Sequence, residues 1–240
     1  MARPSSRAAH AAGWAGCAFV LWSACAAGVS LEVNPVRLTL SRAQSVAALT
    51  VRNASTQPAV LHLKVMAWTQ DGARDRYAPT RDLLATPPIF TLLPGAVQTV
   101  RVGLRRAVDA ERELAYRLYL QEIPGAAPAG TGVRIALRLG VPVFVLPQIH
   151  AAPQLRWRTE HAAGGILLHA HNTGNAHARV VELKLVAGAE TAAHAAGAYV
   201  LPGQTSRWRL DFQKAPPPGA RLRLMTRTDT GDMHADVALE

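Results

Sequence analysis

Apolar residues occupy every second position in the stretch VRIALRLGVPVFV, residues 133–145. Side chains of an extended chain point alternately to its two faces, so Val133, Ile135, Leu137 and Leu139 share one face, with arginines between them on the other. The apolar face continues through further valines to residue 145. Most strands have about five or six residues. The pattern therefore predicts a strand that is long enough to serve two purposes.

Period-two alternation recurs along most of the chain, and no segment holds a helical apolar stripe for three turns. It predicts a first set of strands over residues 31–40, 47–53, 60–68, 89–93, 97–104, 114–123 and 133–146. After the stretch LPQIHAAP, it predicts a second set over residues 154–158, 165–171, 178–186, 199–201, 205–210, 221–227 and 233–239. Seven short strands in about 100 residues are typical of an immunoglobulin-like sandwich. We therefore expect an all-β protein with two immunoglobulin-like β-sandwich domains, residues 27–147 and 148–240.

Turn-forming residues separate the predicted strands, and one turn repeats. LPGAVQTVRV in the first set and LPGQTSRWRL in the second occupy comparable places. They form a weak internal echo, a tight turn that leads into a strand. Thr86-Pro87-Pro88 predicts a strand entrance or an edge, because proline cannot donate to a ladder. The triplet NAS at Asn53 matches a glycosylation site, but we interpret it as turn chemistry.

Residues 1–26 have the features of a secretory signal. Arg3 and Arg7 precede a mostly apolar stretch, and Ala24-Cys25-Ala26 supplies a small-x-small cleavage pattern. The apolar stretch is shorter than the roughly 20 residues that a membrane span needs. We therefore expect export, cleavage near residue 26 and no stable membrane insertion. The only cysteines, at positions 17 and 25, lie in this segment, so the exported chain would be held together by its cores without disulfides.

The chain is basic, with a formal net charge of +10 that is carried mostly by arginine. Nucleic acid is the partner that such a charge first suggests. However, the arginines stand singly along the predicted strands and do not cluster with aromatic residues, and export also argues against this partner. We therefore expect solvated, arginine-rich faces and no nucleic acid.

These segments, taken in order, resemble the periplasmic pilus (fimbrial) chaperones of the chaperone–usher pathway. The resemblance runs from about residue 31 to the C-terminus through NPVRLTL, VRNAS, AWTQ, TPPIFTLLPGAVQTVRV, ERELAYRLYLQEIP, VRIALRLGVPVF, NTGNAHARV, LPGQTSRW and TDTGD. It is closest to the sigma or spore-coat-U-like branch. It implies two sandwiches in an L- or boomerang-shaped arrangement and a periplasmic location, and we expect no cofactor.

The resemblance implies that the chaperone lends the last strand of its first domain to a pilus subunit that lacks its own last strand, before delivery to an outer-membrane usher. Val133, Ile135, Leu137 and Leu139 would face the subunit, and the later valines would fill the chaperone's own core. Full burial of one such side chain contributes about 1.5–3 kcal/mol. Periodicity alone also allows these residues to be ordinary core, and this second interpretation is favoured from Leu139 onward.

The resemblance further implies two basic residues between the domains that hold the subunit's C-terminal carboxylate. The first corresponds to Arg37, whose planar guanidinium suits a carboxylate. The second, a lysine in better-known members, falls at Pro142, which cannot replace it. Arg101 or Arg138 could compensate. The alternatives are an ordinary exposed charge at Arg37 and a structural arginine at Arg101.

An ion network across the hinge is also implied by the resemblance. Its acidic members correspond to Glu113 and Asp229, whereas its basic member falls at Leu146. The sequence therefore leaves this inter-domain network incomplete.

Other classes of function find less support in the residues. His169 and His171 stand two apart on a predicted strand, a spacing that could bind copper or zinc, but no cysteine or carboxylate pair accompanies them. The sequence has no nucleophile elbow and no phosphate-binding loop, so we expect no enzyme and no metal. An exported two-domain adhesion or binding module remains the alternative. An unpaired apolar edge at residues 133–137 would distinguish a chaperone from it.

Overall fold

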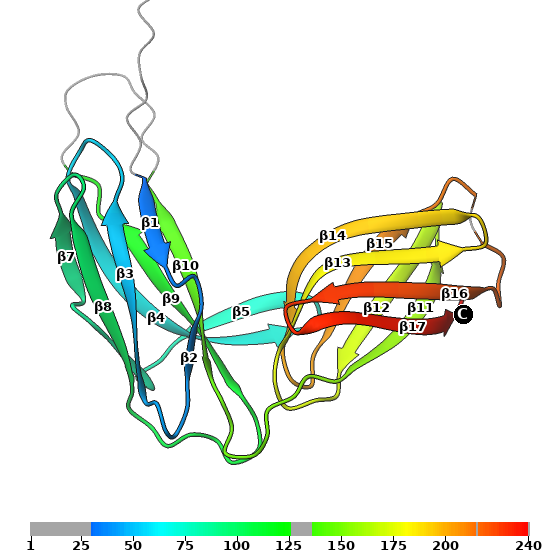
Figure 1. Cartoon of the computed structure of the whole chain (residues 1–240), viewed down its shortest axis with the longest axis horizontal. Helices are drawn as coiled ribbons and strands as arrows, with labels where there is room; N and C mark the ends of the chain where they lie inside the picture. The colour runs from blue at the N-terminus through cyan, green and yellow to red at the C-terminus, as the bar shows by residue number, and fades with distance from the viewer. Residues whose placement is uncertain (1–29, 126–135, 215, 240) are drawn as a thin grey trace, which may run out of the picture.

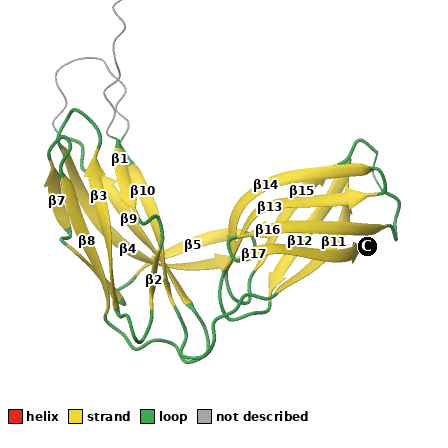
Figure 2. Ribbon diagram, viewed as in Figure 1, coloured by secondary structure: helices red, strands yellow, loops and turns green. Residues whose placement is uncertain are grey.

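The computed structural model describes residues 30–125, 136–214 and 216–239 of the 240-residue chain. Over these ranges it consists of strands and loops without a helix (Figure 2). The strands form two β-sandwiches that are arranged as the two arms of a boomerang (Figure 1). The predicted all-β, two-sandwich fold is confirmed. The predicted signal at residues 1–26 lies outside the described residues.

Ten strands build the first sandwich from two sheets. The four-stranded sheet has the order β1 (Leu31–Asn34), β3 (Val46–Asn53), β8 (Val97–Leu104) and β6 (Leu83–Thr86). The six-stranded sheet has the order β2 (Leu38–Leu40), β10 (Arg138–Val145), β9 (Leu114–Glu122), β4 (Ala59–Asp71) and β5 (Arg74–Pro79), and β7 (Ile89–Leu92) also pairs with β4. The sandwich closes on the inward-facing residues of these sheets.

The first strand changes sheet at a proline. A single strand was expected over residues 31–40, but β1 pairs antiparallel with β3, whereas β2 pairs parallel with β10. Pro35 has no N–H to donate, and the bend at Pro35, Val36 and Arg37 turns the chain from one sheet to the other. This crossing places Arg37 beside β10.

Alternation produces the core of the first sandwich. Leu49, Val51, Val100 and Val102 of the four-stranded sheet are almost fully buried, and they face Leu118, Leu120, Val141 and Val143 of the six-stranded sheet. The even-numbered residues of β9 that line this core alternate with outward-facing odd-numbered residues. The outer face of the six-stranded sheet is therefore free to carry polar and aromatic side chains.

Seven strands build the second sandwich. The three-stranded sheet has the order β11 (Leu155–Ala162), β12 (Gly165–Asn172) and β15 (Thr205–Asp211). The four-stranded sheet has the order β14 (Glu190–Val200), β13 (Ala178–Ala187), β16 (Arg221–Thr228) and β17 (Gly231–Ala238). Its core is separate from that of the first sandwich.

The same hydrogen-bonded corner occurs once in each sandwich. Asn53 and Asn172 are fully buried at the ends of β3 and β12. Each side-chain amide donates to the carbonyl four residues later and to the carbonyl that precedes an LPG turn, over 2.7–3.0 Å. Gly95 and Gly203 of these turns donate their N–H groups back to the two asparagines over 2.8 Å. The echo in the sequence is thus one corner that is built twice.

A small aromatic core joins the sandwiches. Trp68, Phe144 and Leu201 are buried together, and Tyr199 packs against them. The β4–β5 hairpin extends from the first sandwich toward the second (Figure 1). On this hairpin, the Gln70 side chain donates to the Tyr199 carbonyl and accepts from the Leu201 N–H, both over 2.9 Å. The contact is therefore both apolar and hydrogen-bonded.

No helix in the described part of the chain is long and apolar enough to cross a membrane.

Candidate functional site

The described part of the predicted donor segment begins at residue 136, so Val133 and Ile135 lie outside it. Leu137 and Leu139 are half-buried. Leu139 packs against the core of the first sandwich. Glu122 holds Leu137 at both backbone groups, because its carboxylate accepts the Leu137 N–H over 3.0 Å and its own N–H donates to the Leu137 carbonyl over 2.9 Å. The segment that leads into β10 is thus fastened to β9.

One edge of β10 is only partly covered. β9 pairs along the whole of Arg138–Val145. On the other edge, β2 pairs only with Val143, Phe144 and Val145. Within the described ranges, no strand pairs with this second edge before Val143. Among the residues that the structure describes, the first half of β10 is therefore an open sheet edge.

The open edge presents backbone groups to solvent. In an antiparallel strand, the N–H and C=O groups of successive residues point to opposite edges. Because the Leu137 carbonyl bonds to β9 and the Leu146 N–H bonds to β2, the backbone groups of Arg138 and Gly140 face the open edge. Pro142 offers only its carbonyl there. A partner strand could pair with this edge as far as Pro142.

The outer face of β10 is fixed by an arginine–aromatic contact. The Arg138 guanidinium lies 3.8 Å from the centroid of the Tyr119 ring. A Cβ atom added to Gly140 would lie only 3.1 Å from the same ring and 3.2 Å from Arg117. Arg138 is thus held over the Tyr119 ring of its own sheet.

A cleft of about 520 Å³ lies between the sandwiches next to β10. It is lined by Pro35, Val36, Arg37, Arg117, Pro142, Arg179, Tyr199 and Asp229. Three of these residues are cationic and one is anionic. The Arg37 guanidinium, whose side chain is 41% exposed, forms an ion pair with the Asp229 carboxylate. The cleft is therefore an electropositive site in which one arginine is already paired.

Arg117 is the second first-sandwich arginine of this cleft. In the register of β9 and β10 it lies directly opposite Pro142, the position where a lysine was expected. Its guanidinium lies 4.1 Å from the Trp68 ring centroid and donates to the Tyr77 hydroxyl over 3.4 Å. Burial raises the pKa of Tyr77 to about 12, so this partner is neutral. The charge of Arg117 is therefore not neutralised by the hydroxyl.

The other two arginines considered from the sequence lie elsewhere. Arg101 is exposed on β8 and pairs in register with Ala48 and Thr86, in the four-stranded sheet. Neither Arg101 nor Arg138 lines the cleft around Arg37. Sequence reasoning missed Arg117, although its position opposite Pro142 follows once β9 and β10 are paired.

His177 completes the contact between Glu113 and Asp229. Glu113, whose side chain is 1% exposed, accepts from the His177 backbone N–H over 3.1 Å and lies 2.7 Å from His177 Nδ1. His177 Nε2 lies 4.0 Å from Asp229 Oδ2. Leu146, where the basic member was expected, is half-buried and bonds through its N–H to β2. A histidine from the second sandwich thus stands between the two acids.

The histidine pair of the second sandwich does not gather other metal ligands. His171 Nδ1 lies 3.0 Å from the Thr205 hydroxyl, and His169 lies 3.3 Å from Glu160. No group of three or more His, Cys, Asp or Glu side chains in the described ranges is placed to hold a metal ion.

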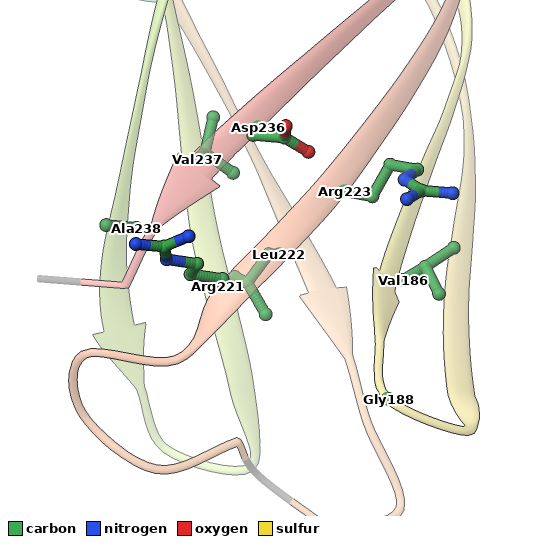
Figure 3. Close-up of a pocket in the computed structure, with 8 residues that line it drawn as sticks. All are labelled: Val186, Gly188, Arg221, Leu222, Arg223, Asp236, Val237 and Ala238. Carbon is green, nitrogen blue, oxygen red and sulfur yellow. The ribbon is translucent and has the colours of Figure 1, made fainter.

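A separate hollow of about 560 Å³ lies on the second sandwich (Figure 3). Its charged lining residues are Arg221 and Arg223 of β16 and Asp236 of β17, and Arg223 and Asp236 are register partners. Val186 of β13 lies opposite Arg223. This hollow shares no lining residue with the cleft beside β10, so it is not part of the candidate site.

Several solved pilus chaperones have the same fold. A chain of the CsuC–CsuE chaperone–tip adhesion subunit pre-assembly complex from the archaic chaperone-usher Csu pili of Acinetobacter baumannii is similar with a TM-score of 0.67 and 20% identity, over 88% of this chain and 99% of that chain. The Salmonella enterica complex of the SafA pilin with the SafB chaperone gives 0.61 and 16%, over 86% and 95%. The E. coli chaperone DraB gives 0.59 and 19%, over 86% and 98%.

Residues 30–150 match a family model that is described as pili and flagellar-assembly chaperone, PapD N-terminal domain. No curated protein matches the sequence. The matched range contains the whole first sandwich, with Arg37, Arg117 and β10. The chain therefore belongs to the pili and flagellar-assembly chaperone family.

Proposed function

We propose that this protein is a periplasmic chaperone that binds pilus subunits by donor-strand complementation and delivers them to an outer-membrane usher. The observation that carries this proposal is the open edge of β10 between Arg138 and Pro142, which ends beside a cleft that contains three arginines. An incomplete sandwich would gain a strand at this edge, with backbone hydrogen bonds for affinity and alternate side chains for specificity.

The donor residues are proposed as Val133, Ile135, Leu137 and Leu139. Leu137 is half-buried and hydrogen-bonded to Glu122 of β9. This supports its assignment as the donor residue that directly precedes β10. Leu139 contacts the protein's own core. We therefore assign the main subunit contacts to Val133, Ile135 and Leu137, and a boundary position to Leu139.

The subunit carboxylate is proposed to bind to Arg37 and Arg117. Both line the same cleft, and Arg117 occupies the register position opposite Pro142. A guanidinium stays charged when it is partly buried and can donate two parallel hydrogen bonds to a carboxylate. Arg101 is exposed on the other sheet, so its proposed role in subunit binding has less support from the geometry.

Periplasmic location follows in this proposal from the family and from the signal-like residues 1–26. We propose that this segment is cleaved near residue 26. A mature chain without cysteine would fold by its two cores and the aromatic contact between them.

Co-purification tests the proposal directly. The protein would be produced in the periplasm together with a pilus subunit from the same organism. Leu137→Arg and Arg37→Ala are expected to lose the subunit. Leu84→Arg places the same change on an exposed leucine of the four-stranded sheet, so it should retain the subunit. Arg52→Ala removes an exposed, ion-paired arginine from the same sheet and should also retain it. If Leu137→Arg and Arg37→Ala both retain the subunit as well as wild type, the proposal fails.

A further inference from the structure

The ion pair in the cleft joins the two sandwiches. Arg37 precedes β2 in the first sandwich, and Asp229 follows β16 in the second. Among the described residues that line this cleft, Asp229 is the only carboxylate. The guanidinium that is proposed to bind a subunit carboxylate is thus already bound to a carboxylate of the protein itself.

Asp229 has further contacts that do not involve Arg37. Its Oδ1 atom accepts the backbone N–H of Arg179 over 3.3 Å, and its own N–H donates to the Arg179 carbonyl over 3.2 Å. Its Oδ2 atom, which pairs with Arg37, lies 4.0 Å from His177 Nε2. If Arg37 were taken by another carboxylate, the Asp229 carboxylate would keep one hydrogen bond, from the Arg179 N–H, and would have an imidazole close to the oxygen that was released.

We propose that Asp229 is the resting occupant of the carboxylate anchor, and that a subunit's C-terminal carboxylate displaces it from Arg37. This inference rests on the proposed function, because it takes Arg37 as the anchor. Two carboxylates that approach the same guanidinium nitrogen repel each other, and this repulsion is strong in a cleft that is partly shielded from water. Asp229 therefore competes with the ligand and lowers the affinity of the anchor for a free carboxylate.

The competition also links ligand binding to the hinge. In the free protein, Arg37–Asp229 and Glu113–His177 both connect the sandwiches. Displacement of Asp229 breaks the first connection and leaves the second intact. The Glu113–His177 contact then holds the arrangement of the sandwiches while the cleft is occupied. Asp229 thus pairs with Arg37 across the hinge while the anchor is empty, and binding of the ligand breaks this pair.

The direction in which Asp229→Asn changes the affinity for a carboxylate ligand distinguishes competition for Arg37 from orientation of Arg37. The probe is an acetylated hexapeptide of alternating threonine and valine with a free C-terminal carboxylate, and its C-terminal amide is the control ligand. Binding is measured by calorimetry with the full-length protein. Asp229→Asn is expected to bind the carboxylate peptide at least threefold more tightly than wild type does. Its affinity for the amide peptide should equal that of wild type. Asp229→Glu, which keeps a competing carboxylate, should bind like wild type.

A matched control addresses the change in overall charge. Asp232→Asn removes the same charge from an exposed residue of β17 that does not line the cleft, so its carboxylate affinity should stay at the wild-type value. If Asp229→Asn binds the carboxylate peptide equally or more weakly than wild type, Asp229 orients Arg37 and the inference is overturned. If Arg37→Ala leaves the preference for carboxylate over amide unchanged, the proposed anchor itself fails.

A measurement on the unaltered protein covers the case in which Asp229→Asn does not fold. The ¹³C resonance of the Asp229 carboxylate is expected to shift when the carboxylate peptide is added, together with the Arg37 side-chain N–H resonance. The amide peptide should move neither signal. A shift of Arg37 alone would show that Asp229 stays in place, which contradicts displacement.

Discussion

The imidazole of His177 stacks on the ring of Phe144, with ring centroids 3.6 Å apart and planes inclined by 10°. Phe144 belongs to β10 of the first sandwich and His177 precedes β13 of the second, so the stack crosses the hinge. The same imidazole lies 2.7 Å from the buried Glu113 carboxylate. One side chain thus takes part in both an aromatic and an ionic contact between the sandwiches.

His177→Ala is therefore expected to destabilise the protein by about 3 kcal/mol, because it leaves the buried Glu113 carboxylate without the imidazole and with only the backbone N–H of residue 177. The free energy of unfolding would be measured in urea by tryptophan fluorescence, to which Trp68 in the hinge contributes. The double variant with Glu113→Gln should lose less than the sum of the two single variants, by at least about 1 kcal/mol. Additive losses would contradict this coupling.

The sequence predicted most strands because their apolar residues alternate, but it missed the four-residue β6, and two longer segments lack that signal. All six residues of β5 are exposed, so they show no buried face, and the sequence predicts no strand there. In β14 the inward positions are largely alanines, and only the end, near Tyr199, was predicted. Pairing with β4 and with β13 gives these residues their structure. Such pairing is a tertiary effect that periodicity does not report.

Some residues of the candidate site could also be predicted from the sequence, and others could not. Arg37, Glu113 and Asp229 were selected from the family resemblance, and the structure brings all three to the hinge. His177 was not selected, because it lies 64 positions from Glu113 and its role depends on how the sandwiches dock. Its only signal was its place in the NTGNAHARV segment. Arg117 required the register of β9 and β10, which a single sequence does not give.

Replacement of Arg117 tests the second member of the proposed anchor. Arg117→Met keeps an apolar chain of similar length over Trp68 but removes the charge, so we expect the affinity for the carboxylate hexapeptide to fall about tenfold, with the amide unaffected. Arg117→Lys restores the charge without the planar fork and should recover only part of this loss. Calorimetric titration of both variants measures the effect. Equal affinity of wild type and Arg117→Met would exclude Arg117 from the anchor.

The repeated asparagine corner predicts a loss of stability in both sandwiches, and the larger loss in the second. Asn172→Ala leaves two buried carbonyls without this donor, so we expect it to destabilise the second sandwich by about 2–4 kcal/mol. Asn53→Ala leaves only the Leu92 carbonyl in this state, because Gln57 is exposed and its carbonyl also accepts from the Ser55 hydroxyl, so we expect a smaller loss of about 1–3 kcal/mol in the first sandwich. Hydrogen exchange would assign each loss to its own sandwich. Gly203→Ala should cost about 1 kcal/mol, because residue 203 has a φ of +74°. Loss of protection in the unaltered sandwich would show that the corners are not independent.

Asp82 predicts a pH-dependent contribution to stability. Partial burial opposes its ionisation, but hydrogen bonds from the Tyr116 hydroxyl over 2.8 Å and from Arg106 over 3.2 Å outweigh this effect and hold the pKa of Asp82 below its ordinary value of 3.8. A carboxyl whose pKa is lower in the folded state stabilises the fold above the unfolded-state pKa. The contribution is therefore present at neutral pH and lost as the pH falls through the folded-state pKa.

Tyr116→Phe removes the hydroxyl that donates to Asp82, and we expect it to reduce the free energy of unfolding by about 1 kcal/mol at pH 7. The tyrosine itself stays protonated there, because burial raises the pKa of Tyr116. The difference between wild type and Tyr116→Phe should shrink when both are unfolded in urea at about pH 3. This pH lies below the ordinary pKa of 3.8, so the unfolded state binds a proton at Asp82 that the folded state takes up less readily. Asp82→Asn has no charge at residue 82 at either pH. The difference in free energy of unfolding between wild type and Asp82→Asn should therefore also be smaller at pH 3 than at pH 7. A difference between Tyr116→Phe and wild type that is as large at pH 3 as at pH 7 would mean that the tyrosine acts through packing and not through the carboxylate.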